Sequence, residues 1–227
     1  MNGEMPASRN AGRDAGRDAG RDKSQATLLV AILAGGRSRR MGRDKAFVPF
    51  DGRPLVARAV ALGRAISPLA MLVVHRDQLN EDRYRQLAAD LEIRLCADEY
   101  DYKGPLGGLV TALRSGQTGN GVVLLACDMP YLTRELIQLL IERHRAGGYA
   151  ATVPVDQEGR LQPLVGVYSE SVLPVAEEMI GLDILRFEAL FDRVRTRVID
   201  FTEIADLRGS ERFFTNLNRP ADLEAET

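Results

Sequence analysis

The sequence predicts an α/β fold with a mostly parallel β-sheet, and two observations support that class. From Thr27 onward, short β-branched runs alternate with amphipathic segments, which is the pattern of consecutive βαβ units. The first run, TLLVAILA at 27–34, is apolar on both faces, as a central strand covered by helices on each side must be. A chain of 227 residues with 45% hydrophobic content can bury one sizeable core of this kind.

The elements after this first strand follow from periodicity and from helix start signals. Pro54 favours a helix start, and apolar residues then recur at helical spacing up to Ile66. Thr133 precedes a further periodic segment as its expected N-cap. In order, we expect a helix over 54–66, a strand over 70–74, a helix over 81–90, a strand over 93–96, a helix over 104–113, a strand over 121–126 and a helix over 133–144.

Two short runs in the second half of the chain flank a turn. AATVPV at 150–155 and LVGVY at 164–168 lie on either side of the sequence DQEGR, which predicts antiparallel pairing at one edge of the sheet. The carboxyl third is less regular. Helices are expected near 171–179 and 183–191, and a strand is expected in TRVIDF at 196–201.

The amino terminus has a different composition from the rest of the chain. Residues 9–25 contain AGRD three times and almost nothing apolar, so burial cannot offset the entropy cost of ordering them. We therefore expect a disordered extension over 1–26 and a single domain over 27–227. A targeting or docking arm is the alternative, although the regular aspartates are unlike those of a transit peptide.

Charge and cysteine content exclude several classes of protein. A net charge of −2 argues against a general nucleic-acid or anionic-membrane binder, because such proteins usually carry a broad basic face. Cys96 and Cys127 stand in separate apolar contexts, which is unlike a disulfide framework or a zinc site. No apolar run reaches the roughly 18 residues that span a bilayer. These features predict a cytoplasmic protein with no nucleic-acid or membrane partner.

A glycine-rich, basic stretch follows the first strand. LAGGRSRRMGRDK, residues 33–45, lies where loops leave the carboxyl end of a strand, the place at which open α/β sheets bind ligands. Gly35 and Gly36 let backbone N–H groups approach phosphate oxygens, and Lys45 adds a mobile positive charge. The stretch is neither a P-loop nor G-x-G-x-x-G. It indicates a phosphate-binding loop; a tight turn with solvated arginines is the alternative.

The longer segment LAGGRSRRMGRDKAFVPFDGRPL, residues 33–55, resembles the L-A-G-G-x-S-x-R-M-G-x-D-K…G-x-P-L signature of molybdenum cofactor guanylyltransferases. Four later blocks of that family have similar counterparts in the same order, namely GPLGGL at 104–109, CDMPYL at 127–132, QPLVGVY at 162–168 and NLNRPADL at 216–223. The resemblance implies a Rossmann-like three-layer α/β/α nucleotidyltransferase fold. It also implies transfer of GMP from Mg·GTP to the terminal phosphate of molybdenum-molybdopterin, with release of pyrophosphate.

The same resemblance assigns roles to individual residues. The implied GTP-binding residues are Leu33, Ala34, Gly35, Gly36, Lys45, His75, Asp98 and Asp128. The implied catalytic residues are Arg40, Lys45 and Asp128; the ligands of Mg²⁺ are Asp128 and Asn218; and the acceptor-binding residues are Arg160, Gln162 and Asn216.

Chemistry supports the central assignments. A cation placed on the negative charge of departing pyrophosphate stabilises the transition state strongly, which suits Lys45. Magnesium prefers one or two carboxylates plus phosphate oxygens and water, which suits Asp128 after the strand GVVLLA. A carboxylate at Asp98 could accept from both donors on the N1–H and N2–H₂ edge of guanine, with the neighbouring Glu99 and Asp101 as alternatives for this position. Cys127 fits a small buried residue better than a nucleophile, because no base accompanies it.

Plain structural roles remain open for several of these residues. Asp128 could cap the loop after its strand, His75 could be a surface residue, Asn218 could cap a helix before Pro220, and Arg160 could be solvated. The chain also departs from the family pattern. His75 stands where relatives often have Asn, Arg219 replaces the usual Thr, and Gln162 replaces the His of some relatives.

Two other functions compete with guanylyl transfer. A sister enzyme would transfer CMP to the same cofactor, or a nucleotide to another phosphorylated acceptor; such relatives tend to read L-A-A-G, whereas this chain has Gly35 in LAGG. A non-catalytic carrier of the molybdenum cofactor would keep the fold without the chemistry, and Lys45 and Asp128 argue against it. The implied substrates are GTP and molybdenum-molybdopterin. Proteins that insert or receive the finished cofactor are further expected partners.

Overall fold

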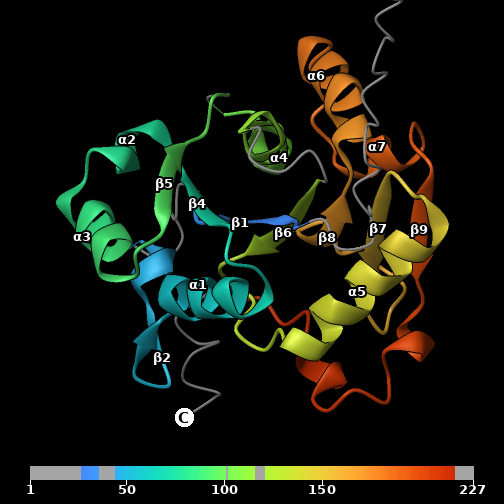
Figure 1. The fold of residues 1–227 in the computed structure, drawn as a ribbon, viewed down its shortest axis with the longest axis horizontal. Coiled ribbons are helices and arrows are strands. Elements are labelled where there is room, and N and C mark those ends of the chain that lie inside the picture. The colour runs from blue at the N-terminus through green and yellow to red at the C-terminus, as the bar shows by residue number, and fades with distance from the viewer. Residues whose placement is uncertain (1–26, 36–43, 101, 116–120, 218–227) are drawn as a thin grey trace, which may run out of the picture.

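The computed structural model of the 227-residue chain describes residues 27–35, 44–100, 102–115 and 121–217. Its centre is a seven-stranded sheet in the order β5-β4-β1-β6-β8-β7-β9 (Figure 1). The strands are β1 Leu29–Leu33, β4 Ala70–Val74, β5 Arg94–Ala97, β6 Val122–Ala126, β7 Ala151–Pro154, β8 Val165–Tyr168 and β9 Thr196–Ile199. A small hairpin pairs β2 Pro49–Phe50 with β3 Arg53–Pro54.

Helices cover both faces of this sheet. They are α1 Leu55–Ile66, α2 Arg76–Leu79, α3 Asp82–Asp90, α4 Gly104–Arg114, α5 Arg134–Gly147, α6 Leu173–Gly181 and α7 Glu188–Phe191. Short 3₁₀ turns lie at Lys45–Phe47, Glu170–Val172, Phe201–Glu203 and Ser210–Arg212. None of the helices in these residues is both long enough and apolar enough to cross a membrane.

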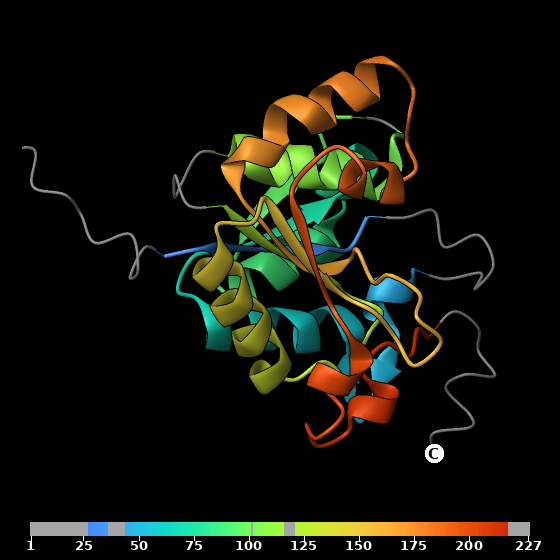
Figure 2. The same ribbon diagram turned by 90° about the vertical axis from the view of Figure 1, so that its right-hand side faces the viewer.

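The apolar alternation of β1 produces two cores, one on each face. Val30 and Ile32 belong to the cluster that packs against α1, α3 and α5, whereas Leu29 and Ala31 belong to the cluster against α4, α6 and α7. Figure 2 shows the same division, with α4, α6 and α7 on one side of the sheet and α1 and α5 on the other. The three-layer α/β/α arrangement that the sequence predicts is therefore confirmed.

Most predicted elements are present with ends shifted by a few residues. The Thr133 side chain accepts a hydrogen bond from the Leu136 N–H at 3.3 Å, which confirms the expected N-cap of α5. The expected helix over 183–191 is shorter: α7 begins at Glu188, because α6 ends at Gly181 and Asp183 adopts φ 57°, which a helix cannot contain. The strand expected over 196–201 ends at Ile199, where Asp200 starts a 3₁₀ turn.

The antiparallel pair of β7 and β8 does not form the edge of the sheet, where it is expected, but lies one strand in from it. β8 runs antiparallel to both neighbours, β6 and β7, as the turn sequence between β7 and β8 predicts. The edge is formed by β9, which pairs in parallel with β7. The sequence places β7 and β8 together, but local pattern carries no information on which strand a later segment such as β9 will join. The predicted extension over 1–26 lies outside the described residues.

The carboxyl ends of the central strands meet at one edge of the sheet. The Ala34 N–H donates to the Val73 carbonyl at 2.9 Å, and the Cys127 N–H donates to the Leu33 carbonyl at 3.2 Å. The Asp98 N–H donates to the Val74 carbonyl at 2.7 Å, which brings the end of β5 alongside. Segments from β1, β4, β5 and β6 are thereby fixed around one place, where such folds bind ligands.

Candidate active site

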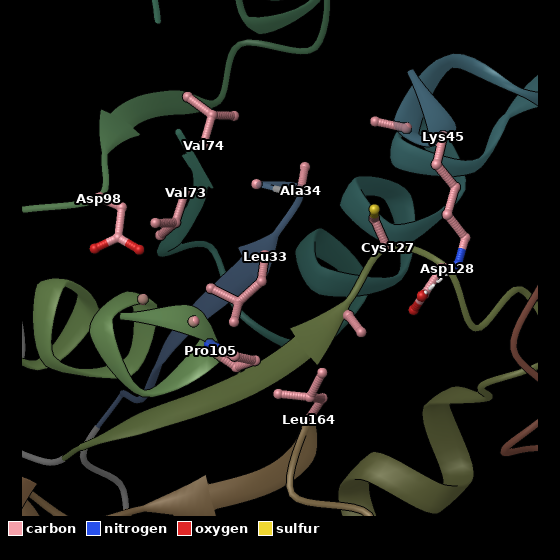
Figure 3. A pocket seen from close by; sticks show the side chains of 15 residues that line it. Leu33, Ala34, Lys45, Val73, Val74, Asp98, Pro105, Cys127, Asp128 and Leu164 are labelled. Carbon is pink, nitrogen blue, oxygen red and sulfur yellow. Dashed lines mark hydrogen bonds and ion pairs between the residues drawn. The ribbon is translucent and has the colours of Figure 1, made fainter. Parts of the chain in front are cut away.

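A cavity of about 330 Å³ opens at this edge of the sheet. Leu33, Val73, Val74, Pro105 and Leu164 supply much of its apolar wall (Figure 3). Six of the residues predicted to bind the nucleotide line it: Leu33, Ala34, Gly35, Lys45, Asp98 and Asp128. An apolar cavity with a few convergent polar groups is the usual form of a small-molecule site.

Lys45 and Asp128 form an ion pair at one side of the cavity (Figure 3). The Lys45 Nζ lies 2.6 Å from Asp128 Oδ2, and the two side chains are 15% and 24% exposed. Lys45 is carried by a 3₁₀ turn, and Asp128 follows β6 directly after Cys127. The structure therefore joins two residues, 83 positions apart in the chain, to which the sequence assigns separate tasks.

The second carboxylate oxygen of Asp128 has an unusual environment. Oδ1 is buried, and within the described residues it accepts no hydrogen bond. Such an atom loses its hydration without a compensating bond, a cost that a bound cation would remove. A carboxylate oxygen is the ligand that magnesium prefers, so Asp128 fits a divalent metal. Across the described ranges of the chain, no group of three or more His, Cys, Asp and Glu side chains could hold a metal ion.

The carboxyl-terminal segment reaches this ion pair through its backbone. The Leu217 N–H donates to the Asp128 carbonyl at 3.1 Å, which places Leu217, and with it the preceding half-buried Asn216, next to Asp128. Asn218 itself lies outside the described residues, as do Gly36 and Arg40.

The backbone of Gly35 lies so close to the backbone at the end of β4 that any larger residue would require one of the two to shift. A Cβ at this position would lie 3.0 Å from the His75 nitrogen and 3.4 Å from the Val74 carbonyl carbon. These neighbours are backbone atoms of the β4 end, which cannot rotate away as a side chain could. Glycine therefore lets the end of β1 pack against the end of β4 at the mouth of the cavity.

Asp98 lies on the side of the cavity opposite the ion pair (Figure 3). Its Oδ1 accepts from the Tyr100 N–H at 3.0 Å and from the Thr111 hydroxyl at 3.2 Å, which fixes the carboxylate against α4. The cavity thus has a carboxylate at one end and a lysine–carboxylate pair at the other. A nucleotide has matching ends, because its base carries N–H donors and its phosphates need cations.

Comparison with known proteins agrees with this geometry. A family model described as the MobA-like NTP transferase domain matches residues 30–194. The chain belongs to this MobA-like NTP transferase family. The predicted family and enzyme class, a nucleotidyltransferase, are thereby confirmed.

Alignments with individual relatives extend over most of this MobA-like chain. A probable molybdenum cofactor guanylyltransferase of Carboxydothermus hydrogenoformans is 34% identical over 197 residues, which are 87% of this chain and 93% of the relative. The molybdenum cofactor guanylyltransferase of Pseudomonas putida is 36% identical over 86% of this chain and 95% of the relative. The crystal structure of molybdopterin-guanine dinucleotide biosynthesis protein A from Archaeoglobus fulgidus has a TM-score of 0.74 at 24% identity, covering 88% of this chain and 96% of the other.

His75 does not line the cavity of this MobA-like chain. Its Nδ1 accepts from the Asp77 N–H at 3.3 Å, so the ring caps α2, and the ring centroid lies 5.2 Å from that of Tyr102. The backbone of His75 is nevertheless next to Gly35 and to Val74, which do line the cavity. The structure accounts for the side chain as a helix cap, and the predicted GTP contact stays a prediction.

None of the three predicted acceptor residues lines the cavity. Arg160 pairs through Nε with Asp156 at 2.8 Å and through Nη2 with Glu158 at 2.7 Å, and Gln162 donates to Asp156 at 3.0 Å. Arg160 lines a separate, polar hollow of about 210 Å³ that also includes Thr215. Two carboxylates therefore already balance the charge of Arg160, and the acceptor role of Arg160, Gln162 and Asn216 stays a prediction.

Cys127 is buried, as expected for a filler of the core, with 8% of its surface exposed. Burial raises the pKa of the thiol well above its usual range, and the nearby Asp128 carboxylate raises it further. The thiol stays protonated at neutral pH, so it is a poor nucleophile.

Sequence reasoning missed two groups of residues near the site. Arg53 and Arg58 line a groove of about 190 Å³ that shares Cys127 with the main cavity. Arg53 occupies the variable position of the G-x-P-L part of the motif, so the motif assigns it no role. Asp44, Gln78 and Tyr84 form a buried polar network beside Lys45. Asp44 stands within the glycine-rich motif, but its partners are 34 and 40 positions away, and no local pattern connects them.

Proposed function

We propose that this chain transfers GMP from GTP to the terminal phosphate of molybdenum-molybdopterin and releases pyrophosphate. The observation that carries the proposal is the pair of Lys45 and Asp128 at one end of a nucleotide-sized cavity, with Asp98 at the other end. Relatives that share about a third of their sequence over most of this chain are named molybdenum cofactor guanylyltransferases, which supports the substrate pair.

The chemical step needs positioning and charge neutralisation more than a general base. An oxygen of the acceptor phosphate attacks the α-phosphorus of GTP in line, and the bond from that phosphorus to the β-phosphate bridging oxygen breaks. The electron pair of this bond leaves with pyrophosphate. Lys45 neutralises the growing charge on the leaving group, at one side of a cavity whose wall is mostly apolar. Arg40 is proposed to act on the same charge.

The residues of the chain would hold a divalent cation, which we take to be Mg²⁺, through Asp128 and Asn218. The buried Oδ1 of Asp128, which accepts no hydrogen bond from any described residue, supports this site. When bound, the cation would polarise the α-phosphate and offset its charge. Leu33, Ala34, Gly35 and Gly36 would offer backbone groups to the nucleotide, with His75 at its edge. Arg160, Gln162 and Asn216 are proposed to bind the acceptor.

Guanine is the base that the site supports best. Asp98 is fixed against α4 as a carboxylate acceptor, and the Watson–Crick edge of guanine presents two donors to such a group, whereas adenine and cytosine each present one. Gly35 supports the same choice by resemblance, because the sister transferases tend to read L-A-A-G where this chain reads LAGG.

We further propose that residues 27–227 act as one domain, that 1–26 are a disordered extension, and that the enzyme works in the cytoplasm. Its partners would be its two substrates and the proteins that insert or receive the finished cofactor, with no nucleic acid. The described residues contain no helix that could span a membrane, in keeping with this proposal.

Pyrophosphate release tests the proposed function. The wild-type enzyme would be supplied with Mg²⁺ and GTP, CTP or ATP, with and without molybdenum-loaded molybdopterin. Asp128→Asn keeps the shape of the side chain and removes its charge. Glu203→Gln is the matched control, because Glu203 pairs with Arg197 at 2.8 Å and is also 24% exposed, but lies away from the cavity lining.

We expect release that requires both GTP and the acceptor, that is lost in Asp128→Asn and that is retained in Glu203→Gln. A preference for CTP would make the protein the sister transferase. No release with any nucleotide would refute an enzymatic role and favour a cofactor carrier.

A further inference from the structure

Among the described residues, the turn that carries Lys45 makes few backbone hydrogen bonds of its own. It is a 3₁₀ turn of three residues, Lys45–Phe47, and its backbone bonds are Phe47 N–H to the Asp44 carbonyl at 3.2 Å and Val48 N–H to the Lys45 carbonyl at 3.1 Å. Runs of this kind are short and have poorer hydrogen-bond geometry than an α-helix. The direction in which Lys45 points must therefore depend on what holds the turn from outside.

Asp44 joins the turn to the rest of the protein. Its Oδ1 caps the turn by accepting from the Ala46 N–H at 3.1 Å. Its Oδ2 accepts from the Tyr84 hydroxyl at 2.8 Å, from Arg83 Nη2 at 2.8 Å and from Gln78 Nε2 at 3.3 Å. The Asp44 side chain is 8% exposed, so its charge is stabilised by these donors rather than by water.

Tyr84 contacts the chain on both sides of Lys45, at Asp44 and at Phe47. Its hydroxyl bonds to Asp44, and its ring meets the ring of Phe47 edge to face, with 4.9 Å between centroids. Tyr84 is fully buried in α3, and burial together with the Asp44 carboxylate raises the pKa of its hydroxyl. The hydroxyl therefore keeps its proton and remains a donor to Asp44.

Gln78 extends this contact to the wall of the nucleotide cavity. Its Nε2 donates to the Tyr84 hydroxyl at 2.9 Å, and its Oε1 accepts from the His75 N–H at 2.9 Å. His75 directly follows Val74, which lines the cavity at the end of β4. A buried chain of hydrogen bonds thus runs from the cavity wall, through Gln78 and Tyr84, to the residue before Lys45.

We propose that Tyr84 is a positioning residue, which acts through Asp44 and Phe47 to aim Lys45 at Asp128 and at the phosphates of the nucleotide. The proposal rests on the proposed function in taking Lys45 as the group that neutralises the leaving phosphates. Contacts from Tyr84 to Asp44 and to Phe47 hold the turn at both ends, so the backbone that carries Lys45 is already in place before the nucleotide binds. A preorganised turn of this kind lowers the barrier to reaction because its backbone does not have to rearrange at the moment of transfer.

Chemical labelling of Lys45 tests the clamp without requiring any enzyme activity. The full-length protein would be treated with a lysine-acylating reagent, and the rate of modification at Lys45 would be read by mass spectrometry, with Lys103 in the same sample as reference. Tyr84→Phe removes the hydroxyl and keeps the ring. Ile137→Val is the control for stability, because Ile137 belongs to the same buried core cluster but makes none of the contacts to the turn described above.

We expect Lys45 to be labelled about fivefold faster in Tyr84→Phe, which is the factor that the loss of one ordinary hydrogen bond corresponds to. Lys103 should be unaffected. In kinetics with GTP, kcat should fall by about the same factor while KM changes less than about twofold, because the opposite end of the cavity is untouched. In an Asp44→Asn background, Tyr84→Phe should add little, because both changes break the same contact.

A labelling rate at Lys45 that is equal in Tyr84→Phe and Ile137→Val would overturn the proposal, and so would full additivity with Asp44→Asn. If the wild-type protein released no pyrophosphate, the proposed function would fail, while a faster labelling of Lys45 would still show the clamp. If transfer occurred and labelling did not change, only the positioning role of Tyr84 would be lost.

Discussion

Replacing Lys45 by methionine should change metal binding and catalysis in opposite directions. The substitution keeps an unbranched, apolar side chain of similar length and removes the ammonium group that lies 2.6 Å from Asp128 Oδ2. In the absence of nucleotide, that ammonium group competes with a divalent cation for the same carboxylate. With nucleotide bound, the ammonium group is needed on the phosphates.

The size of both effects can be worked from the geometry. Two unit charges 2.6 Å apart attract by about 1.6 kcal/mol at the dielectric constant of water and by about 6 kcal/mol at an effective value near 20. Side chains that are 15% and 24% exposed are partly screened by solvent, which favours the lower end of this range. If Lys45→Met removes about 2 kcal/mol of attraction that a metal would otherwise have to overcome, the variant should bind the metal roughly thirtyfold more tightly than the wild type. Loss of a cation from the developing charge should lower kcat by about 10² to 10³.

Titration with Mn²⁺, followed by the EPR signal of the free ion in the absence of nucleotide, measures the first effect. Arg197→Met is the matched control, because it also removes a cation from a carboxylate, Glu203, at 2.8 Å. Tighter Mn²⁺ binding is expected in Lys45→Met alone. Unchanged binding in Lys45→Met would refute the argument that Lys45 and a metal share Asp128, and an equal gain in Arg197→Met would show that the effect is not local.

Three further outcomes are expected. Gly35→Ala places a Cβ 3.0 Å from the His75 nitrogen, so kcat/KM for GTP should fall about tenfold, and steady-state kinetics that match the wild type would contradict this tight packing. Asp98→Asn replaces one acceptor by a donor, so the preference for GTP over ATP should fall at least about tenfold; an unchanged ratio of kcat/KM values would remove Asp98 from base recognition. His144, held between Thr152 at 3.0 Å and Ser169 at 2.9 Å, has a pKa lowered to about 4, first by burial and then by Arg145. Because the unfolded chain binds this proton near pH 6.5 and the folded protein does not, the free energy of unfolding should fall by up to about 3 kcal/mol between pH 6.5 and 4. Urea unfolding at pH 7 and 4.5 measures that loss, and a His144→Gln variant with the same pH dependence as the wild type would contradict it.

Local pattern predicted most of the fold because the pattern and the structure have the same physical cause. The doubly apolar run at 27–34 is buried on both faces as β1, and Thr133 caps α5 where its position before an amphipathic segment predicted. Local pattern did not predict the short α7 or the edge position of β9. The positive φ of Asp183 and the pairing of β9 with β7 depend on packing between distant parts of the chain.

The candidate site shows the same division. The glycine-rich motif identified Gly35 and Lys45, and the end of the strand GVVLLA identified Asp128; all three line one cavity. Their contacts were not predictable, since sequence spacing carries no information on which side chains meet across 83 positions. The ion pair between Lys45 and Asp128 and the placement of Arg160 beside Asp156 came from the tertiary structure.

By itself, the sequence determined the fold class, the family and the residue types that bring chemistry to the carboxyl edge of the sheet. These properties follow from hydrophobic periodicity and from a glycine-rich motif, both of which are local. Only the tertiary structure decided that Asp128 presents one oxygen to Lys45 and leaves the other buried without a hydrogen bond in the described residues. It also decided that Tyr84 and Gln78 reach Asp44 from α3 and α2. The reason is physical: the direction of a side chain is set by packing among elements that are distant in sequence, and that packing forms only when the sheet and its two helical layers assemble.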